Sequence, residues 1–246
     1  MALQPICTAL RIWGGHCLDA ILPRHCVLCG LPCGSGNACG SCRADLPRAD
    51  HACLSCALPI LNAGDLLCGR CLRRAPPWER VVAPLLYAYP VDRLVCRFKF
   101  GRDFACGRLL ALEMLDAVQL DAQPPPDIIA PVPLHRARHV SRTFNQADLL
   151  ARLMGHALAI PVHSRLLRRK RRTRAQSGLD AASRKRNIRG AFQYVSGAHR
   201  LAAGAHVALV DDVMTTGATL AECAKTLRRA GVARVSVWVA ARAPVP

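Results

Sequence analysis

The stretch that most limits how this chain can fold is HVALVDDVMTTGATL, residues 206–220. Its first five residues are short, apolar and β-branched at two positions, which predicts a buried strand of a parallel sheet. Asp211 and Asp212 follow at the expected carboxyl end of that strand, where two adjacent carboxylates need a cationic or hydroxylated partner. A tight turn then leads into a helix, and its backbone N–H groups and Thr hydroxyls suit a phosphate monoester. A ribose 5-phosphate matches both ends of this stretch, with its hydroxyls on the carboxylates and its phosphate in the turn.

The turn that is expected to hold the phosphate is residues 215–219, called the 215–219 turn below. Its glycine lets the backbone approach the phosphate closely. The alternative is an ordinary strand–helix turn with one Thr as the N-cap, but a cap needs neither a second Thr nor an acidic pair. The expected phosphate-binding residues are Thr215, Thr216, Gly217, Ala218 and Thr219.

Residues 80–243 alternate apolar strand-like runs with helical patterns. This alternation predicts an α/β fold with a parallel sheet covered by helices on both faces. In such sheets, ligands bind beyond the carboxyl ends of the strands. The expected strands are residues 81–89, 127–132, 160–163, 207–210 and 235–240, and the expected helices are residues 91–98, 104–120, 144–158 and 218–230.

The chain ahead of this domain has a different composition. Residues 1–23 place apolar side chains on one face of an expected helix, and residues 24–74 form a module rich in Cys, Gly and Pro. Residues 73–80, with two adjacent prolines, are the expected linker. No apolar run reaches the roughly eighteen residues of a membrane helix, and polar residues interrupt the place of a signal-peptide core. We therefore expect a cytoplasmic protein with no membrane span.

Fourteen cysteines occur, mostly in the first third of the chain and mostly as four CxxC pairs. Two such pairs give the tetrahedral set of four thiolates that Zn²⁺ prefers, so we expect two structural zinc ions in a reduced environment. The alternative is four redox-active or incidental pairs. Pairing of neighbouring CxxC motifs gives the two sites, although interleaved ligation is also compatible with the sequence. The expected ligands are Cys26, Cys29, Cys39, Cys42, Cys53, Cys56, Cys68 and Cys71, with Cys33, His25 and His51 as bystanders.

The formal net charge of +18 favours polyanions such as nucleic acid, nucleotides or phosphorylated sugars. Arg136, Arg138 and Arg142 lie in a loop that is expected on the same sheet edge as the Asp pair. That loop either meets a second anionic group, such as a diphosphate, or is a solvated basic loop. For the basic residues 165–187, a solvated loop, an active-site flap and a nucleic-acid contact all remain open. The low aromatic content of 4% weakens a stacking platform for single strands.

VALVDDVMTTGAT resembles the signature of type I phosphoribosyltransferases, which bind 5-phosphoribosyl 1-diphosphate with Mg²⁺. Together with PVPLHRARHVSRTFNQADLLA, RRTRAQSGL and RKRNIRGAF, it is similar to the ComF family of competence proteins over residues 26–239. The resemblance implies a double zinc ribbon followed by a phosphoribosyltransferase domain. It also implies that Asp211 and Asp212 hold the ribose hydroxyls and that the 215–219 turn holds the 5-phosphate. One departure is Thr143, which stands where the family usually has Gly.

Two functions follow from these features. In an enzyme, Asp211 and Asp212 would stabilise the positive charge of an oxocarbenium-like ribose. Mg²⁺ and cationic side chains such as Arg136 and Arg142 would neutralise the departing diphosphate. In a competence protein, as the resemblance implies, the chain would bind the same ligand and help incoming single-stranded DNA reach the cytoplasm. No segment has a recognisable pattern for binding an acceptor base or amine.

Overall fold

The computed structural model describes residues 24–33, 37–49, 51–62, 64–134, 144–170, 188–195 and 204–244. The chain divides into two compact units, residues 1–46 and 47–246. The expected N-terminal helix at residues 1–23 lies outside the described residues. In the smaller unit, an antiparallel pair of strands precedes a short helix; these elements are β1 (Arg24–His25), β2 (Pro32–Cys33) and α2 (Gly40–Ala44).

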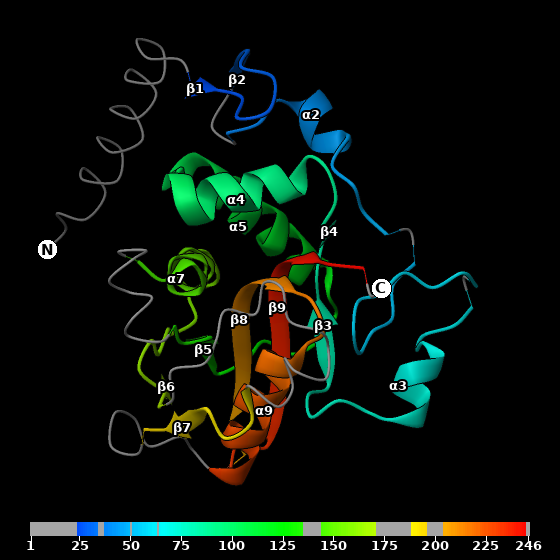
Figure 1. The fold of residues 1–246 in the computed structure, drawn as a ribbon, viewed down its shortest axis with the longest axis vertical. Coiled ribbons are helices and arrows are strands. Elements are labelled where there is room, and N and C mark those ends of the chain that lie inside the picture. Colours follow the sequence, from blue (N-terminus) through cyan, green and yellow to red (C-terminus); the bar gives the residue numbers. More distant parts are fainter. Residues whose placement is uncertain are drawn as a thin grey trace, which may run out of the picture. The chain divides into compact units, whose positions relative to one another are not determined.

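The larger unit contains a parallel sheet with the strand order β3–β9–β8–β5, which runs through the centre of Figure 1. A further short strand, β4, also pairs in parallel with β9. The predicted parallel sheet is therefore confirmed. The strands are β3 (Arg80–Val82), β4 (Leu85–Leu86), β5 (Ile128–Pro131), β8 (His206–Met214) and β9 (Arg234–Arg242).

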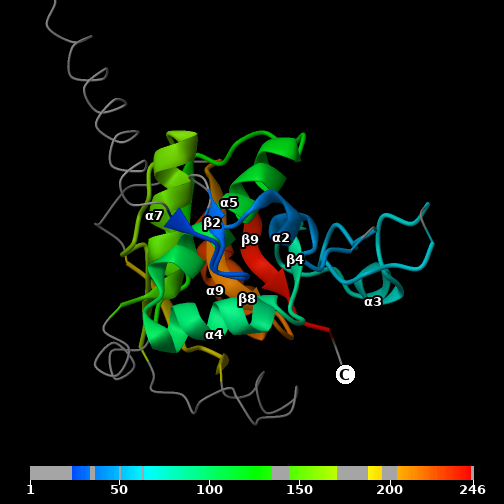
Figure 2. The same cartoon turned by 90° about the horizontal axis from the view of Figure 1, so that it is seen from above.

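Helices cover both faces of this sheet, as predicted (Figures 1 and 2). One face carries α9, whose buried side chains share a core with alternate valines of β9, and the other face carries α5 and α7. α4 lies across the end toward which β8 and β9 point (Figure 1). These helices are α4 (Val91–Gly101), α5 (Phe104–Leu120), α7 (Gln146–Leu158) and α9 (Ala218–Arg229), and α3 (Gly69–Arg73) precedes them in the cysteine module.

Three expected strands differ from the observed ones. The expected strand at residues 81–89 is broken into β3 and β4, because Pro84 between them has no N–H for the ladder. The expected strand at residues 160–163 is reduced to one bridge between Val162 and Ile129. β8 continues past its expected end at Val210 because its pairing with β9 persists to Met214.

The first part of the basic residues 165–187 supplies one strand of a small antiparallel hairpin that was not among the expected strands. β6 (Leu167–Arg169) pairs with β7 (Phe192–Tyr194), and Leu166 and Ile188 beside them are fully buried. The sequence does not predict this hairpin, because two adjacent leucines are too short a run to produce a periodic signal. Glu222 on α9 anchors the hairpin by accepting a hydrogen bond from the Gly190 backbone N–H at 2.8 Å.

Among the described residues, no helix combines the length and the apolar character that crossing a bilayer requires.

Candidate functional site

Asp211 and Asp212 lie in the last part of β8, past the point where the neighbouring strand stops. β5 ends at Pro131, which is in register with Val210, whereas β9 still pairs with Asp211 through Val239. Because successive residues of a strand face opposite sides, the two carboxylates point to opposite faces of the sheet. The two carboxylates therefore have different neighbours, and a ligand would contact each of them separately.

Lys99, near the end of α4, is the ion-pair partner of Asp212, with Nζ 2.9 Å from Oδ2. The Gln146 side-chain amide donates to the Lys99 carbonyl at 3.4 Å and fixes the backbone there. Burial alone would lower the pKa of Lys99, but the carboxylates of Asp212 and Asp211 outweigh burial and raise it. Lys99 therefore stays charged beside both carboxylates.

Lys99 is not predicted from the sequence, because nothing in the pattern of α4 indicates that its last turn reaches β8. Its one distinguishing signal is rarity, since only four of the 34 basic residues are lysines. The motif Phe144-Asn145-Gln146 could have directed attention to it. Asn145 caps α7 by accepting from the Ala147 N–H at 3.2 Å and donates to the Val132 carbonyl after β5 at 3.1 Å. This motif therefore ties α4, β5 and α7 together at the sheet edge.

Arg169 on β6 acts on Asp211 from the other side of the strand. It is 8% exposed, and its guanidinium carbon lies 5.5 Å from the centroid of the Phe192 ring. Arg169 belongs to the segment that was expected to be a solvated loop, a flap or a nucleic-acid contact. Its burial contradicts the solvated and nucleic-acid interpretations for this residue and makes it part of the Asp211 environment.

The pKa of Asp211 is raised to about 7. Burial is the main cause and the neighbouring Asp212 carboxylate adds to it, while Lys99 and Arg169 act in the opposite direction. Because the pKa of Asp211 exceeds the ordinary value of 3.8, its stabilising contribution is complete below that value and is lost as the pH rises through about 7. Asp211 is thus a carboxyl group that changes charge near neutral pH.

The 215–219 turn connects β8 directly to α9. Gly217 is the N-cap residue of α9 and has a φ of 74°, a left-handed conformation that favours glycine. A Cβ at Gly217 would lie 2.8 Å from the Met214 Cε atom and 3.3 Å from the Trp78 ring. The Thr216 hydroxyl accepts from the Ala218 N–H at 3.4 Å. This backbone shape at a helix N-terminus suits an anion such as a phosphate monoester.

Two further parts of the predicted site lie outside the described residues. Arg136 and Arg142, which were expected to meet the diphosphate, belong to residues 135–143 together with Arg138 and Thr143. The larger part of the basic segment, residues 171–187, is outside them as well.

Among the described residues, the eight expected ligands form two clusters of four, each built from neighbouring CxxC pairs, which is the sequential and not the interleaved grouping. The four Sγ atoms of each cluster lie within 4.8 Å of one another. Four sulfurs bound to a tetrahedral zinc at about 2.3 Å are about 3.8 Å apart. The Sγ–Sγ distances of 3.8 Å between Cys29 and Cys39 and of 3.6 Å between Cys56 and Cys68 therefore fit zinc. The first cluster is Cys26, Cys29, Cys39 and Cys42, and the second is Cys53, Cys56, Cys68 and Cys71.

In each cluster one thiol has a lowered pKa while others have raised ones, because the four sulfurs share hydrogen bonds and charge with one another. Burial would raise the pKa of Cys26, but backbone hydrogen bonds, chiefly at Cys29, lower it to about 6. The same balance, with the backbone at Cys71 as the main opposing contribution, lowers the pKa of Cys68 to about 7. His25, His51 and Cys33 belong to neither cluster among the described residues, as expected for bystanders.

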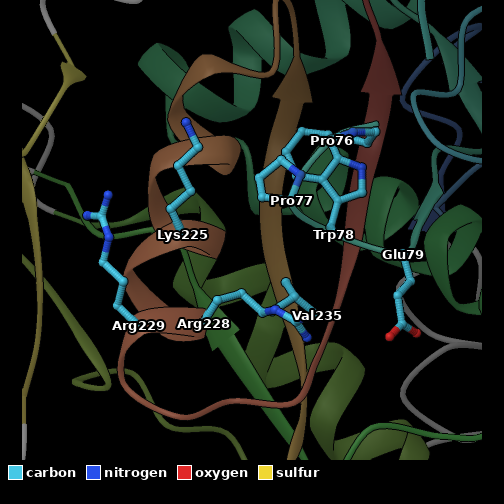
Figure 3. Close-up of a pocket in the computed structure, with 8 residues that line it drawn as sticks. All are labelled: Pro76, Pro77, Trp78, Glu79, Lys225, Arg228, Arg229 and Val235. Carbon is cyan, nitrogen blue, oxygen red and sulfur yellow. The ribbon is translucent and has the colours of Figure 1, made fainter. Parts of the chain in front are cut away.

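A groove of about 390 Å³ lies between the linker and α9 (Figure 3). Lys225, Arg228 and Arg229 of α9 line one side, with Arg228 pointing toward Val235, and the Pro-Pro-Trp segment at residues 76–78 forms the other. Val235, at the start of β9, also lines it, so the groove lies toward the amino end of the strand and away from the Asp pair. It is a second cationic feature, whose basic side chains come from the second half of α9, while Trp78 in its wall also borders Gly217 of the 215–219 turn.

The chain is similar over most of its length to proteins of known name. It is 39% identical to the DNA utilization protein YhgH of Escherichia coli (strain K12), covering 90% of this chain and 98% of that protein. It is 35% identical to competence protein F of Haemophilus influenzae, covering 89% and 97%. Competence protein ComFC of Bacillus subtilis is 26% identical, with 80% of each chain covered. The double zinc ribbon domain family matches residues 17–72.

The chain also has a partial likeness to two solved structures. Adenine phosphoribosyltransferase from Trypanosoma brucei, in complex with AMP, pyrophosphate and ribose-5-phosphate, is 14% identical with a TM-score of 0.36. That likeness covers 57% of this chain and 54% of that one. UMP synthase from Leishmania donovani is 20% identical with a TM-score of 0.32, covering 60% of this chain and 22% of the enzyme.

Proposed function

Because the chain belongs to the ComF family, with YhgH and competence protein F among its relatives, we propose that it binds 5-phosphoribosyl 1-diphosphate with Mg²⁺. One observation carries this proposal: β8 leads from Asp211 and Asp212 directly into the 215–219 turn at the N-terminus of α9. Carboxylates accept hydrogen bonds from ribose hydroxyls, and the helix N-terminus favours a phosphate. The spacing between these groups suits a phosphorylated ribose.

Each group in the site has a separate task in this proposal. Asp211 and Asp212 hold the ribose hydroxyls, and the 215–219 turn holds the 5-phosphate. Lys99 and Arg169 supply positive charge on the two faces of β8. Arg136 and Arg142 are the proposed partners of the diphosphate. Mg²⁺ binds together with the diphosphate and neutralises part of the diphosphate's negative charge. Residues 206–210 and α9 keep these groups in place because they belong to the core.

The biological role proposed for the chain is the handling of DNA in the cytoplasm. Its relatives are named for DNA utilization and for competence, and its own charge of +18 favours a polyanion. Single-stranded DNA is the proposed polymer, with the phosphoribosyl ligand as a bound regulator or co-substrate.

The alternative is an active phosphoribosyltransferase whose acceptor is unidentified. It is favoured by the pKa of Asp211 near neutrality, a common property of groups in catalytic sites. Release of pyrophosphate from 5-phosphoribosyl 1-diphosphate, measured with a panel of bases and amines, separates the two functions. Turnover with one acceptor would establish the enzyme, whereas tight binding without pyrophosphate release would establish a binding module.

Binding of 5-phosphoribosyl 1-diphosphate should strengthen as the pH rises through about 7. The raised pKa of Asp211 means that its carboxyl group is protonated below that pH and accepts hydrogen bonds less well. Below the pKa, affinity should therefore fall by up to about tenfold per pH unit. Titrations of the wild type and of Asp211→Asn across this range measure the effect.

The ratio of the two affinities is the informative quantity, because protonation of the ligand's own phosphate affects both proteins equally. The ratio should grow with pH and level off above about 8. A ratio that is constant with pH would show that ionisation of Asp211 plays no part in binding.

Single-stranded DNA should bind electrostatically to one of two described cationic surfaces. Each surface offers one lysine and two arginines, so matched triple substitutions to Gln are available. Since each phosphate contact on a single strand contributes about 0.7 to the salt dependence, losing three contacts should lower the slope by about 2. The two sets are Lys225, Arg228 and Arg229 beside the groove in Figure 3, and Arg165, Arg168 and Lys170 around β6.

Salt titrations of a fluorescent oligonucleotide distinguish the two surfaces. The set around β6 borders the Asp211 environment, so binding there should compete with 5-phosphoribosyl 1-diphosphate. Binding at the groove should be unaffected by that ligand. DNA binding that is insensitive to salt and unchanged in both triple variants would contradict the proposed partner.

A further inference from the structure

A buried arginine, Arg242, joins the second cysteine cluster to the 215–219 turn. Arg242 is the last residue of β9 and is 1% exposed. Its Nε donates to the Cys56 carbonyl at 2.6 Å. Its Nη1 donates to the Met214 carbonyl at 2.8 Å and to the Thr215 carbonyl at 2.5 Å. One guanidinium thus holds a residue of the cysteine cluster and the two residues at which β8 enters the turn.

The first CxxC of the second cluster is held at three consecutive carbonyls by β3, by β9 and by Trp78 just before β3. These are the carbonyls of residues 54, 55 and 56, which lie between and at the two cysteines of this motif. The bonds run from the Val81 N–H to Leu54 at 2.9 Å, from the Trp78 indole N–H to Ser55 at 2.7 Å, and from the Arg242 Nε to Cys56 at 2.6 Å.

Trp78 provides a second connection to the turn. Its ring borders Gly217 so closely that a Cβ there would lie 3.3 Å from the indole. Its indole N–H is bound to Ser55, between the two cysteines of the same CxxC motif. The cluster therefore reaches the 215–219 turn along two routes, one polar and one apolar.

The buried positive charge of Arg242 also favours a second cluster that contains zinc. A buried guanidinium is costly unless an anion compensates it, and arginine does not lose its proton in proteins. Among the described residues, the hydrogen-bond acceptors of Arg242 are backbone carbonyls, and its Nη2 is buried with no hydrogen-bond partner. Zinc with four thiolates has a net negative charge, and the second cluster would place this charge beside Arg242.

We propose that zinc in the second cysteine cluster sets the conformation of the 215–219 turn through Arg242 and Trp78. Anion binding at the turn then depends on metal in the second cluster and not on metal in the first. Naming that anion as a phosphorylated ribose rests on the proposed function, whereas the control of the turn does not. Because coupling between two sites is reciprocal, a phosphate ligand in the turn should slow the loss of zinc from the second cluster.

Amide hydrogen exchange of residues 214–220, together with zinc content, tests the proposal without any ligand. Arg242→Lys keeps the positive charge beside the cluster. It loses the planar guanidinium, which donates to the Cys56 carbonyl and to the Met214 and Thr215 carbonyls at the same time. It should retain two zinc ions, exchange these amides on the order of tenfold faster, and leave exchange in residues 206–210 unchanged. Cys68→Ser in the second cluster should accelerate the same amides, and Cys29→Ser in the first should not.

Equal exchange in the wild type and Arg242→Lys would overturn the proposal, and so would equal acceleration by the two cysteine variants. If Arg242→Lys fails to fold, amide exchange of residues 214–220 in Cys68→Ser, compared with that in Cys29→Ser, tests the proposal instead. A second measurement follows zinc release to a chromophoric chelator with ribose 5-phosphate present, and one of the two zinc ions should leave several-fold more slowly. If the ligand does not bind the wild type although the exchange results hold, the proposed function fails and this inference stands.

Discussion

Replacing Asp211 and Asp212 together by Asn should weaken binding of 5-phosphoribosyl 1-diphosphate by roughly 100-fold. Hydrogen bonds to charged groups contribute about 1.5–3 kcal/mol each, and two of them are weakened at once. Asn keeps the side-chain shape and an oxygen for Lys99, so the sheet should remain folded. Equilibrium binding of radiolabelled ligand measures the loss, and thermal melting checks the fold.

A matched control removes the same number of negative charges at positions outside the proposed site. Asp65 and Asp116 are exposed acidic residues far along the sequence from β8, and replacing both by Asn alters the net charge equally. This control should bind like the wild type. If it loses as much affinity as the Asp211/Asp212 variant, the effect comes from net charge and the assignment of ribose hydroxyls to β8 is wrong.

Purified protein should contain two zinc ions per chain, and removing both should lower its melting temperature by roughly 10 °C or more. Zinc bound by four thiolates contributes folding free energy directly, because the ligand set does not exist in the unfolded chain. Most of the loss should come from the second cluster, whose Cys53, Cys56 and Cys71 belong to the core of the larger unit. Elemental analysis and thermal melting with a strong chelator measure both quantities.

Single substitutions assign the two zinc ions to their clusters. Cys29→Ser and Cys68→Ser should each leave one zinc ion, and Cys33→Ser should leave two, because Cys33 lies outside both clusters. A folded, metal-free protein with disulfides in place of the clusters would contradict the account. So would a zinc ion lost on replacing Cys33.

Local patterns account for the parts of the molecule that the sequence predicts well. Neighbouring CxxC pairs fold into two clusters because each pair already forms a ligand-bearing turn. The predicted helix at residues 104–120 has the observed bounds because Asp103 caps it, accepting from the Ala105 and Cys106 N–H groups. β8 and α9 are recognised because an apolar run, an acidic pair and a Gly turn follow one another directly.

What the sequence does not predict comes from contacts between residues far apart in the chain. Lys99 meets Asp212, and Arg242 meets Cys56, across long sequence separations that no periodicity encodes. Arg169 looks like one more member of a basic run until the β6–β7 hairpin buries it. In each case, tertiary structure places a wholly or partly buried charged side chain beside a group that the sequence pattern does assign to a site.

The central claim, a site for a phosphorylated ribose, is tested most directly by calorimetry on the zinc-loaded wild type. 5-Phosphoribosyl 1-diphosphate should bind once per chain in the presence of Mg²⁺. Omitting Mg²⁺, or using ribose 5-phosphate without the diphosphate, should weaken binding without abolishing it, because the Asp pair and the 215–219 turn still hold the ribose and its phosphate. Absence of binding with Mg²⁺ present, in protein that contains two zinc ions and melts cooperatively, would contradict the account.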